Sequence, residues 1–408
     1  MSESDDKLLS ELADSYGTPL YVVFESRLQT AYRNFLDAFS KKWPQITIAY
    51  SYKTNSLLAV CRLFHSLGAW AEVTSGVELY AAQRLEVQPS HVIFNGPHKT
   101  DDELEAIQRM GYCVNIDGWY ELERLSALAE RLGPCSVGLR VNPGNKQLPH
   151  WDKFGFSMTS GDALNAVHRI KHDKNLRLIG LHTHIGTNIA NAGLFFESAN
   201  MVGGFSVRIE NIYGAPLQYL DLGGGFATYQ PVPYFEDSWS PASLIEYADA
   251  IARGLTESGV RSEMQLILEP GRVLTTNTTL LLTRVVEVKT SSDRGFIAIV
   301  DTGVNQIPSA SWMKHNIRPI HSEQTELVET DIFGNLCMQA DLLGVGVRLN
   351  RPKPGNLIAI EDVGAYNLSM SYPFIRPRPA TVLVKSNGQV EKIRRREKPE
   401  DIFALETL

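Results

Sequence analysis

The sequence predicts a (β/α)8 barrel followed by a second, mostly antiparallel β domain. The first observation is that eight short apolar runs rich in Val, Ile and Leu recur between residues 47 and 269. Such runs are typical of parallel strands that are covered on both faces. The second is that helical patterns lie between them, and eight strands alternating with helices fit a closed barrel. The third is that strands with few helices between them follow Thr278.

The barrel strands are expected at 47–52, 70–74, 91–94, 112–116, 136–141, 178–184, 217–222 and 264–269. The clearest helices between them are 57–67, 101–110 and 119–132, and Asp101 is the expected N-cap of the second of these. The alternative fold is a doubly wound open sheet. No G-x-G-x-x-G turn follows the first strand, so a dinucleotide-binding fold has no support.

The second domain is predicted from a change of pattern near Thr278. Its expected strands are 279–288, 295–301, 345–349, 356–362 and 380–385. Pro19–Phe24 forms an additional strand that could join this domain. We therefore expect a barrel domain at 25–275 and a β-rich domain at 1–24 and 276–408.

The composition excludes several classes of partner. The net charge of −7 gives no general attraction for nucleic acid or anionic membranes, and the basic cluster at 392–396 is expected to be a solvated strand end. The opening residues are acidic and polar, unlike an export signal, and no apolar run reaches the roughly 20 residues that span a bilayer. The four cysteines form no C-x-x-C pair, so we expect no metal site and a cytoplasmic location.

Chemically active residues follow the predicted barrel strands, where catalytic groups of such barrels lie. They are Lys53, Glu72, Asn95, Asn142, His184, Asp221, Gly223–Gly225, Glu269 and Arg272. A lysine amine forms an imine with an aldehyde, glycine backbone amides bind phosphate, and a carboxylate holds a pyridinium proton. Together they meet the needs of pyridoxal 5'-phosphate.

Six motifs in order extend this interpretation from about Tyr16 to Leu405. They are YGTPLY at 16–21, YKTN at 52–55, GLHTHIG at 180–186, LDLGGGF at 220–226, EPGR at 269–272 and EDVGAYNLSM at 361–370. With these motifs the chain resembles the fold-type III pyridoxal-phosphate decarboxylases for diaminopimelate, ornithine and arginine. The diaminopimelate branch is the most similar.

The resemblance implies a role for each matching residue. Lys53 corresponds to the lysine that holds the cofactor as a Schiff base, Glu269 to the carboxylate that pairs with the pyridine nitrogen, and His184 to the histidine that stacks on the ring. His182, two positions away, competes with His184 for that role, and we prefer His184. The phosphate is expected to contact Gly223, Gly224, Gly225, Gly271, Arg272 and Tyr366. Thr187 stands where the family usually has serine, and Glu72 where it usually has aspartate.

Cys337 matches the family cysteine that reaches across a homodimer interface. The resemblance thus implies that the barrel at 25–275 binds the cofactor and that the β-rich domain completes the active site at a dimer interface. The resemblance implies that it protonates the substrate carbon after carbon dioxide leaves, and that Asp341 belongs to the same site. Thiols suit proton transfer because their pKa can be tuned towards neutral pH. The alternative is that Cys337 is an ordinary small hydrophobic residue.

The substrate side departs from the family pattern. Met338 replaces a glutamate that binds the distal amine of diaminopimelate, and Trp312 and Arg318 stand where the family's RPALY stretch is altered. Phe374–Ile375 replaces a tyrosine–asparagine pair. Because a buried unpaired ammonium is costly, these changes favour a different substrate, such as a conjugated or carrier-protein-linked amino acid of specialised metabolism.

The expected reaction is decarboxylation of an amino acid through an external aldimine and a quinonoid intermediate. Three alternatives stay open: a diaminopimelate decarboxylase that makes L-lysine, an amino-acid racemase on the same barrel, and a non-catalytic regulator. Cys337 favours decarboxylation over racemisation. The presence of Lys53, Glu269 and Arg272 argues against a regulator that has lost the cofactor.

Overall fold

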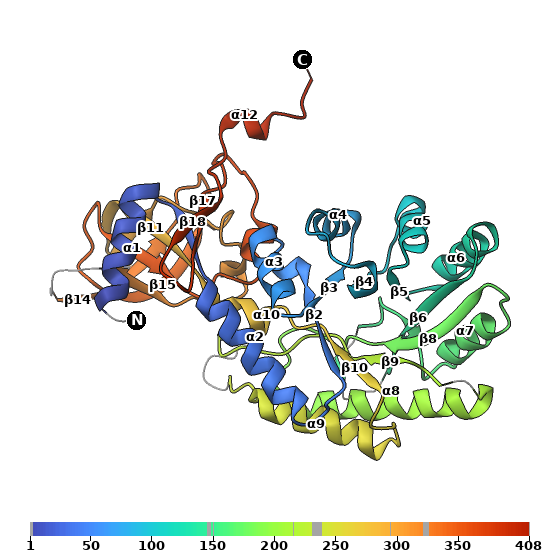
Figure 1. Ribbon diagram of the computed structural model, residues 1–408. Helices are drawn as coiled ribbons and strands as arrows, with labels where there is room; N and C mark the ends of the chain where they lie inside the picture. The colour runs from blue at the N-terminus through green and yellow to red at the C-terminus, as the bar shows by residue number, and fades with distance from the viewer. Residues whose placement is uncertain are drawn as a thin grey trace. The chain divides into compact units, whose positions relative to one another are not determined.

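A computed structural model describes residues 3–144, 148–149, 151–214, 216–230, 239–293, 295–320 and 326–407. The chain forms two compact units (Figure 1). The barrel unit comprises Ala31–Thr228 and Ser240–Val273. The β unit comprises Met1–Thr30, Tyr229–Trp239 and Leu274–Leu408. Among the described residues, no helix combines the length and apolar character needed to cross a membrane.

The barrel unit contains a closed ring of eight parallel strands. They are β2 (Ile46–Ser51), β3 (Trp70–Val73), β4 (Val92–Phe94), β5 (Cys113–Ile116), β6 (Cys135–Asn142), β8 (Leu176–His182), β9 (Tyr219–Asp221) and β10 (Gln265–Leu268). The ring closes because β10 pairs with β2 and β5 pairs with β6, all in parallel. The eight predicted strands are thus confirmed, with ends that differ by at most two residues. A two-residue strand, β7 (Phe156–Ser157), extends β6.

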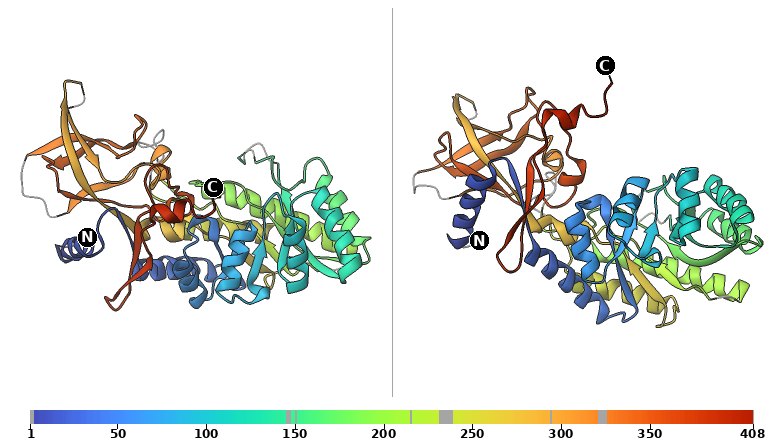
Figure 2. Two further views of the ribbon diagram at one scale, coloured as in Figure 1. Left: turned by 90° about the horizontal axis from the view of Figure 1, so that it is seen from above. Right: turned by 45° about the horizontal axis from the view of Figure 1, so that its top comes forward.

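Helices surround the barrel strands on their outer side (Figure 2). They are α2 (Glu25–Ser40), α3 (Leu58–Ser66), α4 (Gly76–Arg84), α5 (Asp101–Met110), α6 (Trp119–Leu132), α7 (Asp162–Lys171), α8 (Ala192–Tyr213) and α9 (Leu244–Glu257). The prediction that Asp101 caps α5 is wrong by one residue. Thr100 is the N-cap, because its hydroxyl accepts from the Glu103 amide while the Glu103 carboxylate accepts from the Thr100 amide.

The β unit is built on one nine-stranded sheet. Its strands are β1 (Leu20–Phe24), β11 (Thr279–Ser291), β12 (Gly295–Val300), β13 (Ile317–Ile320), β14 (Leu327–Phe333), β15 (Leu342–Asn350), β16 (Leu357–Ile360), β17 (Ala380–Val384) and β18 (Val390–Arg394). The N-terminal strand β1 joins this sheet, antiparallel to β11 and parallel to β17, which confirms the prediction for Pro19–Phe24. Most pairings are antiparallel, as expected, but the β12–β14 pairing is also parallel.

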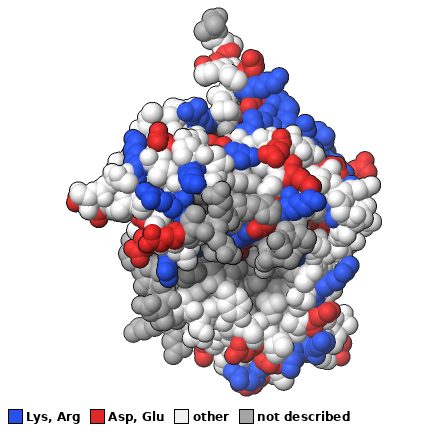
Figure 3. Space-filling model, turned by 90° about the vertical axis from the view of Figure 1, so that its left-hand side faces the viewer, with Lys and Arg blue, Asp and Glu red and all other residues white. Residues whose placement is uncertain are grey.

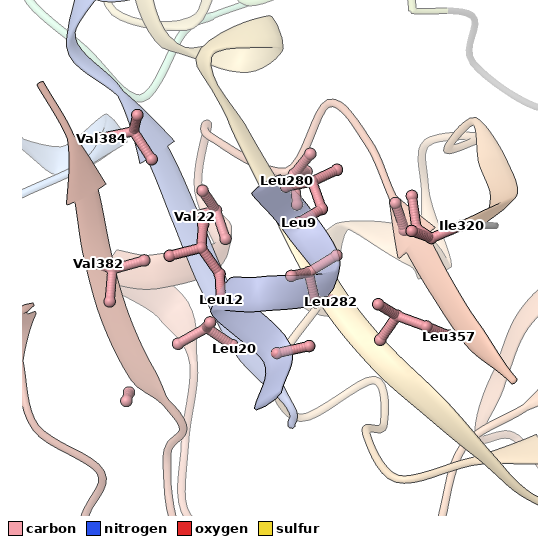
Figure 4. Close-up of a cluster of buried hydrophobic side chains, with 13 residues drawn as sticks. Leu9, Leu12, Leu20, Val22, Leu280, Leu282, Ile320, Leu357, Val382 and Val384 are labelled. Atoms are coloured by element: carbon pink, nitrogen blue, oxygen red, sulfur yellow. The ribbon is translucent and has the colours of Figure 1, made fainter. Parts of the chain in front are cut away.

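Helix α1 (Glu3–Tyr16) covers part of this sheet and was not predicted. Its buried residues Leu9 and Leu12 pack against Leu20 and Val22 of β1 and against Leu280 of β11 (Figure 4). Residues three or four positions apart lie on one face of a helix, so this spacing buries a single stripe. Polar and acidic residues between them hid the stripe in the sequence.

His315 ties together three segments of the β unit. Its Nδ1 lies 3.0 Å from the Glu361 carbonyl oxygen, and its Nε2 lies 2.7 Å from the Ser309 hydroxyl. Burial, only partly offset by the bond to Glu361, lowers the pKa of His315 to about 4. The folded chain therefore holds this imidazole neutral at pH values where the unfolded chain protonates it.

We expect this difference to weaken the fold in acid. An unfolded histidine takes up its proton near pH 6.5, so the contribution of His315 is present above that pH and is lost progressively towards pH 4. At pH 4.5 the wild type should have lost about 2 kcal/mol more stability than a His315→Gln variant, relative to pH 7. Urea unfolding at both pH values measures the difference, and equal losses in the two proteins would contradict it.

Two arginines of the basic cluster near the C-terminus bind other parts of the chain. Arg395 pairs with Asp401 at 2.5 Å, and Arg396 donates to the carbonyl oxygen of Pro19 at 2.8 Å. Figure 3 shows Lys and Arg side chains interspersed with Asp and Glu side chains on this face of the β unit. Arg395 and Arg396 therefore help to fix the structure of the strand end.

Candidate cofactor-binding site

Lys53 lies at the carboxyl end of the first barrel strand. It occupies a short 3-10 turn, η1 (Tyr52–Thr54), directly after β2. Its Nζ lies 2.8 Å from Glu72 Oε2, which also accepts from the Ser51 hydroxyl at 2.5 Å. Glu72 is buried, whereas 39% of the Lys53 side chain is exposed. The carboxylate thus fixes an amine that stays accessible to an aldehyde.

Glu269 follows β10 and is buried inside the same ring of strands. Its Oε1 accepts from Asn95 Nδ2 at 2.6 Å, and its Oε2 lies 3.4 Å from His182 Nε2. Burial opposes ionisation, but His182, Lys53 and Asp221 together hold the pKa of Glu269 below its ordinary value. The carboxylate is therefore ionised and suited to a cationic partner such as a pyridinium.

Asp221, at the end of β9, is the acidic neighbour of Glu269. It is fully buried, and burial together with the adjacent Glu269 raises its pKa well above the ordinary value. Two buried carboxyl groups in contact cannot both ionise, so Asp221 holds the proton and Glu269 the charge. One nitrogen or carboxylate oxygen from each of His182, Asp221 and Glu269 lies within 4.8 Å of the other two.

The two candidate histidines have different surroundings. His184 lies two residues after β8, where its Nδ1 accepts from the Gly224 amide at 3.1 Å and its ring meets Trp151 edge-on at 5.4 Å. Burial, followed by the charge of Lys53, lowers the pKa of His184 to about 3, so the ring is neutral. The imidazole of His182 instead lies beside the Glu269 carboxylate inside the barrel. This geometry favours His184 as the ring-stacking residue.

The triple glycine after β9 is packed against backbone on two sides. A Cβ on Gly224 would lie 2.3 Å from the Glu269 carbonyl oxygen, and one on Gly225 would lie 2.3 Å from that of Gly186. Gly223 and Gly225 also have positive φ, at 67° and 95°. Only glycine fits this turn, so no side chain of the turn itself covers its backbone. The Gly223 amide already donates to Asp221 Oδ1 at 2.9 Å and the Gly224 amide to His184, so an anion would meet the Gly225 end of the turn.

Gly271 and Arg272 complete this edge of the barrel unit. A Cβ on Gly271 would lie 2.0 Å from the Thr54 hydroxyl, so the turn after Glu269 packs directly on the residue after Lys53. Arg272 begins α10 (Arg272–Thr275), and Thr187 is exposed after β8. The sequence of the turn thus fixes the relative position of the amine and the buried carboxylate.

We expect a Gly224→Ala variant to lose about 1–3 kcal/mol of stability, because the added methyl overlaps the Glu269 backbone. The overlap strains Gly224 and Glu269, which are both predicted to contact the cofactor, so the affinity for pyridoxal phosphate should fall as well. Gly204→Ala is the matched control, since no atom lies within 4 Å of its Cβ position. Thermal unfolding and cofactor titration of both variants measure these effects, and identical behaviour would contradict the expected overlap.

The remaining predicted residues belong to the β unit. Cys337 is a free, exposed thiol, and Met338 is 40% exposed. Asp341 is buried, and its two oxygens accept from the amides of Val304 and Leu336 at 2.7 Å. Asp341 therefore holds the loop that carries Cys337, a role that the sequence had not indicated.

Three further predicted residues of this unit differ in their surroundings. Arg318, in β13, pairs with Glu361 at 2.9 Å and with Asp6 at 2.8 Å. Trp312 is half-buried after a short 3-10 turn, and Tyr366 has a left-handed backbone at φ 63°. Such a backbone is uncommon for a bulky residue and often marks a functional site.

The donor set in the barrel unit fits pyridoxal phosphate. It offers an accessible amine, a buried ionised carboxylate, a neutral imidazole and a turn that only glycine can form. These groups match the aldehyde, pyridine nitrogen, ring face and phosphate of that cofactor.

Comparisons with known proteins agree with this fit. Residues 27–276 match the family model described as pyridoxal-dependent decarboxylase, pyridoxal binding domain. Diaminopimelate decarboxylase of Methanocaldococcus jannaschii is 33% identical, with 97% of this chain and 92% of the relative covered. The enzyme of that name from Aquifex aeolicus is 31% identical, at 95% and 91% coverage.

Solved structures give the same result. The crystal structure of diaminopimelate decarboxylase from M. jannaschii in co-complex with L-lysine has a TM-score of 0.90 and 31% identity, covering 98% of this chain and 94% of that chain. Lysine/ornithine decarboxylase from Vibrio vulnificus has a TM-score of 0.82 at 19% identity over 95% of this chain and all of that one, and shares the fold.

Proposed function

The chain belongs to the pyridoxal-dependent decarboxylases, and from this premise we propose that it decarboxylates diaminopimelate. It is a pyridoxal-phosphate-dependent amino-acid carboxy-lyase. The observation that supports diaminopimelate is the near-complete coverage by relatives of that name at 31–33% identity. They favour this substrate over the specialised-metabolism substrate that the altered motifs suggested.

We assign the chemistry to residues as follows. Lys53 provides the amine that attaches the cofactor, and the ionised Glu269 holds a proton on the ring nitrogen. His184 supports the ring face, while Gly223–Gly225 and Arg272 bind the phosphate. When bound, pyridoxal phosphate withdraws electrons from the bond to the departing carboxylate. The exposed Cys337 returns a proton to the carbon left behind.

A second candidate is an amino acid without a free distal ammonium or carboxylate, either free or linked to a carrier protein. Met338 carries this alternative, because a thioether cannot pair with an ammonium group at the position where the family has glutamate. Arg318 adds to it, since a substrate carboxylate would have to displace Glu361 or Asp6.

Carbon dioxide release from meso-diaminopimelate distinguishes the two candidates. If diaminopimelate is the substrate, the wild type should convert it to lysine with a kcat/KM of at least about 10⁴ M⁻¹s⁻¹. Met338→Glu should then change this value little. Negligible turnover by the wild type, together with a gain of about tenfold or more in Met338→Glu, would support the second candidate. Met110→Glu, at an exposed methionine on the barrel unit, is the control.

We further propose a homodimer with shared active sites, located in the cytoplasm. Val77 and Tyr120, on the first turns of α4 and α6, are 81% and 79% exposed, and Tyr80, at the start of the second turn of α4, is 59% exposed. The first turns of barrel helices lie at the end of the barrel where catalytic groups gather, so a second copy would cover apolar surface beside the site. Light scattering on the purified chain tests this assembly, and a monomer at micromolar concentration would contradict it.

A further inference from the structure

A chain of hydrogen bonds crosses the interior of the barrel towards the proposed cofactor site. Cys113 Sγ lies 3.2 Å from the Tyr219 hydroxyl, which donates to Asn115 Oδ1 at 2.9 Å. Asn115 Nδ2 in turn donates to Asn95 Oδ1 at 2.8 Å. Asn95, Asn115 and Tyr219 are each at most 4% exposed. The last member, Asn95, directly follows β4.

Asn95 joins this hydrogen-bond chain to two carboxylates. Its Nδ2 donates to Glu269 Oε1 at 2.6 Å and to Glu72 Oε1 at 3.2 Å. An ionised carboxylate only accepts hydrogen bonds, so the amide nitrogen must face both glutamates, and its two hydrogens serve one each. Its oxygen is left to accept from Asn115. The orientation of Asn95 is therefore fixed from both sides.

This arrangement links the two predicted cofactor contacts. Glu72 holds Lys53 through Oε2 and Asn95 through Oε1, while Glu269 is held by the same amide. We propose that Asn95 is a positioning residue that joins Glu72 and Glu269 into one hydrogen-bonded unit and so couples proton binding at the Lys53 nitrogen to that at the cofactor ring. The proposal rests on the proposed roles of Lys53 and Glu269.

Electrostatics gives the direction of the coupling. Two carboxylates buried around one amide repel each other, and the positive end of the amide dipole offsets that repulsion. Lys53 also favours the charged form of Glu269, which places the two groups within electrostatic reach. Removing the amide hydrogens leaves more negative potential beside Lys53. The Lys53 nitrogen should then keep its proton to higher pH.

The visible absorbance of the bound cofactor, titrated with pH in the holoenzyme, tests the proposal. Asn95→Ala and Asn95→Asp should each raise the midpoint of the absorbance change by about one pH unit. Each should also weaken cofactor binding about tenfold. Asn95→Asp keeps the volume of the side chain but offers at most one hydrogen. Its absorbance midpoint therefore still tests the proposal if Asn95→Ala does not fold.

Asn115→Ala is the matched control. It removes the same side-chain atoms from the next residue of the hydrogen-bond chain, and Asn115 bonds to Asn95 and Tyr219 but to neither carboxylate. Its midpoint should stay within about 0.3 pH units of the wild type. Unchanged midpoints in Asn95 variants that still bind the coloured cofactor, or an equal shift in Asn115→Ala, would overturn the proposed role of Asn95. Either result would leave the proposed cofactor site intact. A wild type that binds no cofactor at Lys53 would overturn the proposed site and this inference with it.

Discussion

A Lys53→Ala variant should lose covalent cofactor attachment and at least about 10³-fold in kcat/KM for decarboxylation. The loss follows from geometry, since the Lys53 amine is held at the strand end by buried Glu72 while staying accessible. Without it, pyridoxal phosphate could bind only through its phosphate and ring contacts. Carbon dioxide release and visible absorbance of the purified variant measure the two effects.

Lys42→Ala is a suitable control for this experiment. Lys42 is as exposed as Lys53, with 41% of its side chain accessible, and also pairs with a carboxylate, that of Asp249 at 2.6 Å. Surface pairs of this kind contribute little, so Lys42→Ala should keep near wild-type activity and colour. A Lys53→Ala variant that stays coloured and active would remove the basis for the proposed site.

A Glu269→Gln variant should have the second largest effect, a fall in kcat of about 10²- to 10³-fold. Glutamine keeps the size of the side chain but cannot carry the negative charge that a protonated ring nitrogen needs. It also brings an amide towards Asn95 Nδ2, which already donates at 2.6 Å. Steady-state kinetics and the pH dependence of the cofactor absorbance measure the change.

Glu78→Gln is the matched control for Glu269. Glu78 is similarly buried, and burial followed by the charge of Glu72 raises its pKa, so replacing its carboxylate by a neutral amide should cost less than the same change at Glu269. Its carboxylate accepts from the Thr74 amide, a bond that the glutamine oxygen preserves. Similar kcat values for Glu269→Gln and Glu78→Gln would argue against a charged partner for the ring.

The barrel was predictable from the sequence because its strands are covered on both faces. Runs such as 264–269 are mostly apolar, so they stand out without knowledge of their neighbours. Helix α1 was missed because only Leu9, Leu12 and a few neighbours are buried, and β14 was missed because its first half is exposed. Such elements depend on contacts with distant strands that a local pattern does not reveal.

The site divides in a similar way. Lys53, Glu269 and the glycines stand directly after strands, where the topology of a barrel alone makes them candidates. The hydrogen bond between Asn95 and Glu269 could not be predicted from the sequence, because the two residues are 174 positions apart and meet only in the folded barrel. The ion pairs of Arg318 were equally hidden, because Asp6 comes from a helix that was not predicted.

Borohydride reduction of the purified protein, followed by peptide mass mapping, tests the central claim most directly. The reagent fixes an imine as a stable amine and so marks the lysine that held the cofactor. The account predicts one modified peptide, with the added mass on Lys53. Modification of a different lysine, or of none, would contradict it.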